Sequence, residues 1–288
     1  MQVRSVVPRR ALAGCLLVTL ALSACGGSDN TTAARSQPQR MSVTARDFAL
    51  KIDGSPSLRP GPVTITARNT GKQAHGLVLV KLSDGVDTPA LVKALTTTPG
   101  KLGEMLTYVG GTTTLPRGSY WQGTTSFDPG SYAMLDVGVA KSGRLNFTRS
   151  GEVLGFTVEG KPVRTASARP DAEVSLYDYG IDVPKVIPAS GRIRVNNTGL
   201  DDHQLIVQPV ASAAEAKRLI ADIKAGRSAH LTARPVEILA PTTGATSTTV
   251  RYALAKGAYV AYCRYATARS GGRAHASLGM VAAFAVTG

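Results

Sequence analysis

Short segments with alternating hydrophobic and polar residues, separated by glycine and proline turns, fill most of the chain after residue 42. In one segment Val63, Ile65 and Ala67 alternate with threonines, and in another Ile193 and Val195 alternate with arginines. Successive side chains of a strand point to opposite faces, so these segments predict strands with one buried face. The pattern therefore predicts an all-β fold in which short strands pack as sandwiches.

Two segments show a helical pattern instead. Thr88 can cap a helix whose first position is occupied by Pro89. Further along, Ser212 and Glu215 fit a capping box, and Gly226 can end the helix that follows. We expect two short helical inserts, each placed after a strand that begins with histidine, with a packing role.

The pattern repeats at an offset of about 128 residues. The segments 69–75 and 197–203 both begin Asn-Thr-Gly and end in histidine. The repeat predicts two tandem copies of one domain, at residues 42–160 and 172–288, each long enough for its own core. Residues 161–171 lack an apolar pattern and are the predicted linker.

The N-terminus has the features of a secretion signal. Three arginines precede the apolar run 11–22, and the sequence Leu-Ser-Ala-Cys ends at Cys25. This tetrapeptide resembles the lipobox of bacterial lipoproteins, which implies a signal peptide at residues 1–24 and a lipid on the Cys25 thiol. An ordinary signal peptide with a chance cysteine is the alternative. Residues 25–41 are polar and predict a flexible tether, so we expect a lipid anchor on the extracytoplasmic face of the cell membrane.

The charge is strongly positive. The formal net charge is +14, and it falls to +11 once the three arginines of the signal are removed. Such a surface could lie against anionic lipids or an acidic partner, although a solvated arginine-rich surface explains it equally simply. A nucleic-acid partner is not expected outside the cell membrane.

Cysteine usage points to one residue. Cys15 leaves with the signal and Cys25 is lipidated, so Cys263 is the single thiol that remains. A lone cysteine in an exported protein requires an explanation. It could be a buried inert thiol, an intermolecular disulfide or a metal ligand. Strand alternation directs Cys263 inward, at the end of a strand where loops gather.

Other metal-ligating residues accompany this thiol. His275 and Met280 follow Cys263, and His203 opens the strand after the turn at Gly199. A thiolate, two imidazoles and a thioether form a ligand set that favours copper. A surface histidine and a core methionine are the alternatives for single members of the set.

These motifs resemble the cupredoxin family. The resemblance implies Greek-key β-sandwiches and one type 1 copper ion in residues 172–288, held by His203, Cys263 and His275 with Met280 as a weak axial ligand. The loop from Cys263 to His275 is longer than in plastocyanin-like members. The resemblance also offers Tyr262 as a possible electron path, although a strand-favouring aromatic residue is an equally simple interpretation.

The N-terminal copy departs from this pattern. His75 is retained, but the cysteine position falls at Asp136, the second histidine position near Phe147 and the methionine position at Glu152. Without a thiolate, residues 42–160 are expected to lack a complete copper site. We expect this copy to have a structural or partner-binding role.

The functional expectation is a membrane-anchored copper protein that transfers single electrons. Copper storage or delivery, and a metal-free binding lipoprotein, are the alternatives. An enzyme is not expected, because four histidines leave too few ligands for further copper centres. An acidic redox protein could dock on the arginines near the ligand loop, which are Arg264, Arg269 and Arg273.

Overall fold

The computed structural model describes residues 38–47, 49–54, 57–139, 145–146, 152–165, 168–227 and 233–288. The predicted signal peptide, Cys25 and most of the tether lie outside these residues, as do Phe147 and His230. Among the residues that are described, no helix has both the length and the apolar character needed to span a membrane.

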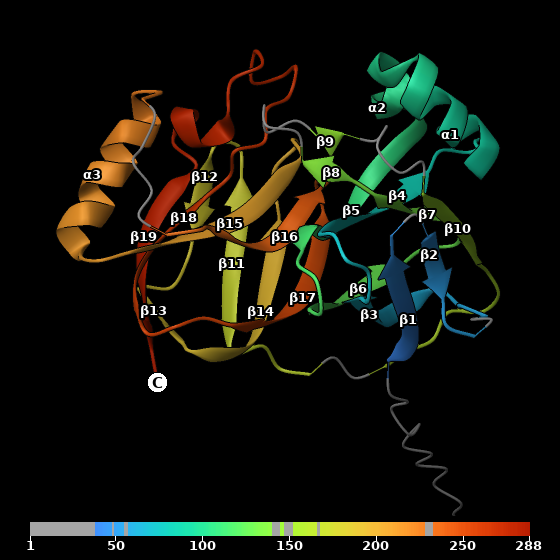
Figure 1. The fold of residues 1–288 in the computed structure, drawn as a ribbon, viewed down its shortest axis with the longest axis horizontal. Coiled ribbons are helices and arrows are strands. Elements are labelled where there is room, and N and C mark those ends of the chain that lie inside the picture. The colour runs from blue at the N-terminus through green and yellow to red at the C-terminus, as the bar shows by residue number, and fades with distance from the viewer. Residues whose placement is uncertain are drawn as a thin grey trace, which may run out of the picture. The chain divides into compact units, whose positions relative to one another are not determined.

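Two large sheets pack against each other, and each contains strands from both halves of the sequence (Figure 1). The eight-stranded sheet has the order β12 (Gly180–Asp182), β11 (Ala172–Tyr177), β14 (Ser190–Asn197), β17 (Thr246–Ala253), β6 (Tyr120–Phe127), β3 (Gly61–Asn69), β1 (Gln39–Arg46), β2 (Ala49–Ile52). The nine-stranded sheet has the order β10 (Val153–Val158), β7 (Gly130–Asp136), β4 (His75–Leu82), β5 (Leu106–Leu115), β16 (Val236–Thr242), β15 (His203–Val210), β18 (Gly257–Tyr262), β19 (Val281–Thr287), β13 (Val186–Pro188). A small separate sheet pairs β8 (Gly138–Val139) with β9 (Leu145–Asn146).

Each half has its own core between the two sheets. The predicted alternation is confirmed: Val63, Ile65 and Ala67 are buried in one core, and Ile193 and Val195 are buried in the other. Trp121 packs against both cores. The two halves therefore contact each other through apolar packing as well as through the shared sheets.

The helical inserts follow β4 and β15. The first comprises α1 (Thr88–Thr97), a 3-10 turn η1 (Pro99–Lys101) and α2 (Leu102–Met105), and the second is α3 (Ala213–Lys224). The predicted cap at Thr88 was wrong by one residue, because the Asp87 side chain accepts the hydrogen bond from the Ala90 N–H. The predicted cap at Ser212 is confirmed, since its side chain accepts from the Glu215 N–H.

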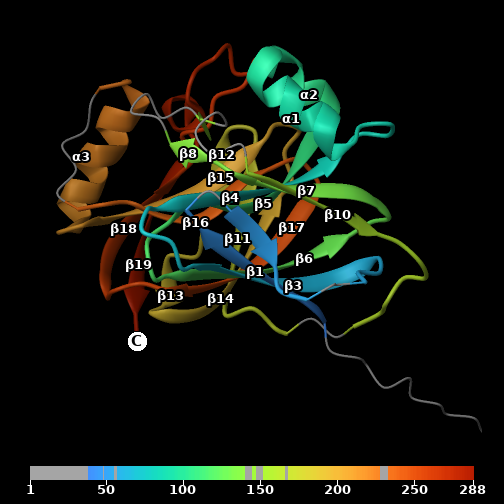
Figure 2. The ribbon, with the colours of Figure 1, turned by 45° about the vertical axis from the view of Figure 1, so that its right-hand side comes forward.

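The helices cover the face of the nine-stranded sheet that points away from the two cores. Apolar residues of α1 and α2 pack on β4, β5 and β7, and those of α3 pack on β15 and β18. In Figures 1 and 2, α3 lies beside β18 and β19, whereas α1 and α2 lie together near β4 and β5. Strands β4 and β15 are therefore buried on both faces along most of their length.

The predicted fold class, two tandem all-β sandwiches with helical inserts, is confirmed. Residues 35–288 form one compact unit, and the predicted boundaries at 160 and 172 stay a prediction. The sequence did not indicate that β17 would pair with β6 and β16 with β5, which makes both sheets continuous across the halves.

Candidate metal centre

The four predicted ligand residues gather at one end of the nine-stranded sheet. His203 is the first residue of β15, and Cys263 directly follows the neighbouring strand β18. His275 begins a 3-10 turn, η2 (His275–Leu278), and Met280 directly precedes β19. The predicted inward direction of Cys263 is confirmed, because its side chain belongs to the core of the C-terminal half together with that of Met280.

Backbone hydrogen bonds fold the loop 264–279 back over the strand end. The Cys263 N–H donates to the Met280 carbonyl at 3.2 Å, and the Ala276 N–H donates to the Cys263 carbonyl at 2.7 Å. The Met280 N–H donates to the His275 carbonyl at 3.1 Å. These bonds return His275 to the side of Cys263, so the long spacing between them does not separate the two ligands.

Three donor atoms converge in this centre. Nδ1 of His203 lies 3.0 Å from Nδ1 of His275, and Sγ of Cys263 lies 3.7 Å from Nδ1 of His275. All three donor atoms lie within 4.8 Å of one another. All four predicted ligand residues are 0 % exposed. The donors thus surround a point that solvent does not reach, which suits a single metal ion.

A carboxylate fixes the outer nitrogen of His203. Nε2 of His203 lies 2.8 Å from Oδ1 of Asp178. The N–H groups of Leu200 and Asp201 donate to the same carboxylate at 3.0 to 3.2 Å. A hydrogen-bonded Nε2 fixes the ring orientation and leaves Nδ1 to face the other ligands. The sequence analysis did not identify Asp178. The signal that could have found it is Asp47, which occupies the equivalent position in the N-terminal copy.

His275 has a corresponding set of partners. Its Nε2 lies 3.6 Å from Oδ2 of Asp201 and 3.4 Å from Oγ1 of Thr267. The hydroxyl groups of Thr267 and Tyr179 donate to Oδ2 of Asp201 at 2.8 and 3.2 Å. These contacts direct Nδ1 of His275 toward the centre.

Gly199 provides the space that the carboxylate needs. A Cβ atom at this position would lie 2.4 Å from Oδ1 of Asp178 and 2.8 Å from Nε2 of His203. The turn at Gly199 therefore needs a residue without a Cβ atom because the carboxylate and the imidazole approach its backbone closely. The turn itself is held by Asn197, whose side chain accepts from the Gly199 N–H and donates to the carbonyls of Asp201 and Thr242.

Burial shifts the pKa values of two residues of the centre in the direction that favours their neutral forms. Burial raises the pKa of the Cys263 thiol to about 12, and the N–H of Gln204, 3.4 Å from the sulfur, lowers it only in part. Burial and the neighbouring His203 hold the pKa of His275 below its ordinary value. The thiol therefore remains protonated at neutral pH unless a cation stabilises the thiolate, and metal binding should release this proton.

The residues around the centre differ in exposure. Tyr262 lies away from the core of the sandwich and is buried among residues that include those of α3 and η2. The three arginines predicted to meet a partner are all exposed on the ligand loop; they are Arg264, Arg269 and Arg273.

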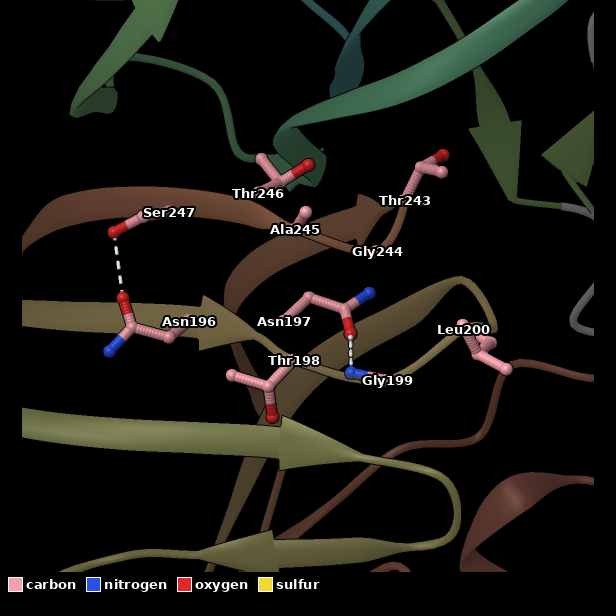
Figure 3. A pocket seen from close by; sticks show the side chains of 10 residues that line it. All are labelled: Asn196, Asn197, Thr198, Gly199, Leu200, Thr243, Gly244, Ala245, Thr246 and Ser247. Carbon is pink, nitrogen blue, oxygen red and sulfur yellow. Dashed lines mark hydrogen bonds between the residues drawn. The ribbon is translucent and has the colours of Figure 1, made fainter.

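An open hollow lies beside the turn at Asn197 (Figure 3). Residues 196–200 and 243–247 line it, and none of the four ligand residues is among them. Leu200, which is 75 % exposed, lies at its edge. Figure 3 shows the hydrogen bond from Gly199 to Asn197 that shapes this side of the hollow.

No protein-family model and no curated protein matches the sequence. Among solved structures, a multicopper oxidase is 13 % identical and covers 86 % of this chain and 88 % of its own, with a TM-score of 0.26. An auracyanin from Roseiflexus castenholzii is 19 % identical and covers 40 % of this chain and 95 % of its own (TM-score 0.25). A copper nitrite reductase from Nitrosomonas europaea is 13 % identical and covers 88 % and 94 % (TM-score 0.25).

The fold and the site together define a class. Tandem β-sandwiches with histidine, cysteine and histidine donors gathered at one sheet end are the arrangement that the resemblance to cupredoxins implies. The chain has a cupredoxin-like fold, and its His/Cys/His group supports copper binding.

The expectation that the chain is not an enzyme was wrong. Solved structures matched over 86 to 88 % of its length include copper oxidases and copper nitrite reductases. The expectation depended on counting histidines in one chain. Such a count misses any centre whose ligands come from two subunits.

Proposed function

We propose that the chain binds one copper ion at a type 1 centre in its C-terminal half and transfers single electrons through it. The main support is the convergence of His203 Nδ1, His275 Nδ1 and Cys263 Sγ in a buried site. Bound copper would supply a one-electron couple between its two common oxidation states. One-electron transfer of this kind occurs in electron carriers and in oxidoreductases. We therefore propose the electron-transfer step and assign no overall reaction.

The residues of the centre have distinct roles in this proposal. Cys263 gives the thiolate, and the N–H of Gln204 points to its sulfur. Asp178 and Asp201 orient the two histidines through their outer nitrogens. Met280 is the weak axial ligand. A fixed, dry site limits rearrangement between oxidation states, which favours fast electron transfer.

Complete burial also bears on the alternative of copper delivery. A delivery protein has to present its metal to another protein, whereas His203, Cys263 and His275 are 0 % exposed. Handover of the ion would require the loop 264–279 to open. The geometry therefore favours electron transfer over delivery.

We further propose that an acidic redox protein docks on the exposed arginines of the ligand loop, with Tyr262 as a candidate path on the α3 side. The sequence of the N-terminus supports a lipid anchor at Cys25 and an extracytoplasmic location. If the anchor is correct, Cys25→Ser should move the protein from the membrane fraction to the soluble fraction of the source cell.

The visible absorption spectrum after addition of Cu(II) tests the copper proposal. We expect an intense blue thiolate-to-copper band that is absent in Cys263→Ser. Met280→Leu is the matched variant, and it should retain the band and shift the reduction potential. A blue band that persists in Cys263→Ser would refute the assignment.

A further inference from the structure

A second group of ligating side chains occupies the corresponding place in the N-terminal half. His75 is the first residue of β4, Asp136 is the last residue of β7, and Glu152 directly precedes β10. These are the positions that His203, Cys263 and Met280 occupy in the other half. The repeat in the sequence aligns Asp136 with Cys263 and Glu152 with Met280. It did not indicate that the side chains of Asp136 and Glu152 would lie close together.

The three side chains form a compact cluster. One nitrogen of His75 and one oxygen each of Asp136 and Glu152 all lie within 4.8 Å of one another. Nδ1 of His75 is in direct contact with Oδ2 of Asp136. His75 is 7 % exposed and Asp136 is 6 % exposed. Two carboxyl groups and an imidazole are therefore packed together with almost no access to water.

The hydrogen-bonding capacity of this cluster is incomplete. Among the described residues, both carboxylate oxygens of Glu152 are buried without a hydrogen-bond partner. A buried carboxylate without donors is costly, and nearly all buried polar groups in folded proteins have a partner. A cation between the three side chains would supply the missing partner.

The surroundings of His75 match those of the copper-ligand histidine. Oδ1 of Asp47 lies 3.6 Å from Nε2 of His75, and the N–H groups of Lys72 and Gln73 donate to this carboxylate at 2.8 to 3.1 Å. A Cβ atom at Gly71 would lie 2.5 Å from Oδ1 of Asp47 and 2.9 Å from Nε2 of His75. This arrangement orients Nδ1 inward, as a metal ligand requires.

We propose that His75, Asp136 and Glu152 form a second metal site, which binds Zn²⁺ or a similar divalent cation. One imidazole and two carboxylates are the nitrogen and oxygen donors that Zn²⁺ accepts, and the absence of sulfur disfavours Cu(I). The two negative charges balance those of a divalent ion. The N-terminal half thus holds a metal site of another class. This role is additional to the structural or partner-binding role expected from the sequence.

Zn²⁺ titration of the purified protein tests this site once the C-terminal ligands are removed. In a chain with Cys263→Ser and His275→Gln, we expect one Zn²⁺ per chain, measured by calorimetry and by metal analysis after gel filtration. Adding Asp136→Asn should weaken Zn²⁺ binding by at least the roughly 10- to 100-fold that loss of an outer partner costs. Glu152→Gln should have a similar effect, and the exposed Glu159→Gln should have none.

The outcomes separate the proposal from its alternative. Unchanged far-UV circular dichroism in the two nearly isosteric variants would show that lost binding is not lost folding. If the chain binds no Zn²⁺ at all, the two carboxyl groups share a proton and the site proposal is overturned. Binding that survives both Asp136→Asn and Glu152→Gln would also overturn it, because the ion would then be elsewhere.

Discussion

The two ligand clusters of this molecule share one frame and differ in their donor atoms. In each half an asparagine side chain accepts from the N–H of the glycine two residues later, at 2.8 Å for Asn69 and 3.0 Å for Asn197. Each asparagine amide also donates to two carbonyls, one in its own turn and one on a strand of the other sheet. The turn that presents the histidine is therefore the same in both halves.

The carboxylate behind each histidine is also shared. Asp47 and Asp178 both accept from backbone N–H groups of that turn and approach Nε2 of the histidine. The difference lies at the strand ends, where Asp136 and Glu152 replace Cys263 and Met280. The frame sets the direction of the histidine in both halves, whereas the residues at the strand ends supply different donor atoms.

Exchanging the donor between the halves should have the largest effect. Cys263→Asp gives the C-terminal cluster the carboxylate of the N-terminal one, so the thiolate band should disappear completely and Cu(I) affinity should collapse, because Cu(I) prefers soft sulfur ligands. Absorption after Cu(II) addition and competition with a Cu(I) chelator measure the two effects.

The matched variant for this exchange is Asp136→Asn, which changes the other cluster. We expect the blue band of that variant to be the same as in the unmodified protein. A blue band that survives in Cys263→Asp, or disappears in Asp136→Asn, would contradict the division of metal classes between the halves.

Removal of equivalent core leucines tests whether the halves fold together. Leu77 and Leu205 each lie two residues after the histidine, and each is buried in the core of its own half. Leu→Ala at either position should lower the free energy of unfolding by about 2–5 kcal/mol. Because both sheets are continuous, we expect one cooperative transition that shifts in both variants, measured by chemical denaturation.

The exposed Leu200 is the control, and Leu200→Ala should change stability by no more than about 0.5 kcal/mol. Two separate transitions, each sensitive to only one of the core substitutions, would show that the halves are independent despite their shared sheets.

The carboxylates of Asp178 and Asp47, which lie beside His203 and His75, should each affect metal binding only in their own half. Asp178→Asn removes the charge behind His203, so copper affinity should fall by roughly 10- to 100-fold. Asp47→Asn should leave copper affinity unchanged and weaken Zn²⁺ binding by a similar factor, as measured by competition titrations. If Asp47→Asn weakened copper binding instead, the two frames would not be separate units.

The sequence predicted the strands, the helical inserts and the convergence of His203, Cys263 and His275, because these depend on local periodicity and on distinctive residue types. Cys263 was recognisable as a lone thiol, and His203 by the turn before it. Asp178 and Asp201 were missed, since their contacts with the histidines are made across the fold. The cap was predicted at Thr88, one residue too late, because the side chain that accepts from the Ala90 N–H is that of Asp87.

The joining of the sheets was missed for a similar reason. The pairing of β16 with β5 involves strand edges that are distant in sequence, and no local pattern specifies which edges meet. The meeting of Asp136 with Glu152 likewise depends on the pairing of β7 with β10. The expectation that the chain is not an enzyme depended on a count of histidines in one chain, and such a count leaves out ligands that another subunit could supply.

The smallest effect concerns a carboxylate that joins the two halves. Glu237 of β16 accepts hydrogen bonds from Thr113 in the N-terminal half and from the side chain of Gln204, the residue after His203. Burial raises the pKa of Glu237, and the hydrogen bonds from Thr113 and Gln204 lower it only in part. The folded protein therefore holds this proton more tightly than the unfolded chain does.

The direction of the pH dependence follows from this difference. The contribution of Glu237 to stability is fully present below its unfolded pKa, and it is lost as pH rises through the raised folded pKa. The glutamine side chain in Glu237→Gln cannot ionise. The stability of this variant relative to the unmodified protein should therefore increase as pH rises above the pKa that Glu237 has in the unfolded chain. Denaturation at several pH values, with the exposed Glu104→Gln as the control, measures this difference. The stability difference between Glu237→Gln and the unmodified protein could instead stay constant with pH. That result would show that Glu237 ionises as readily in the folded protein as in the unfolded chain, because its hydrogen-bond donors stabilise the carboxylate.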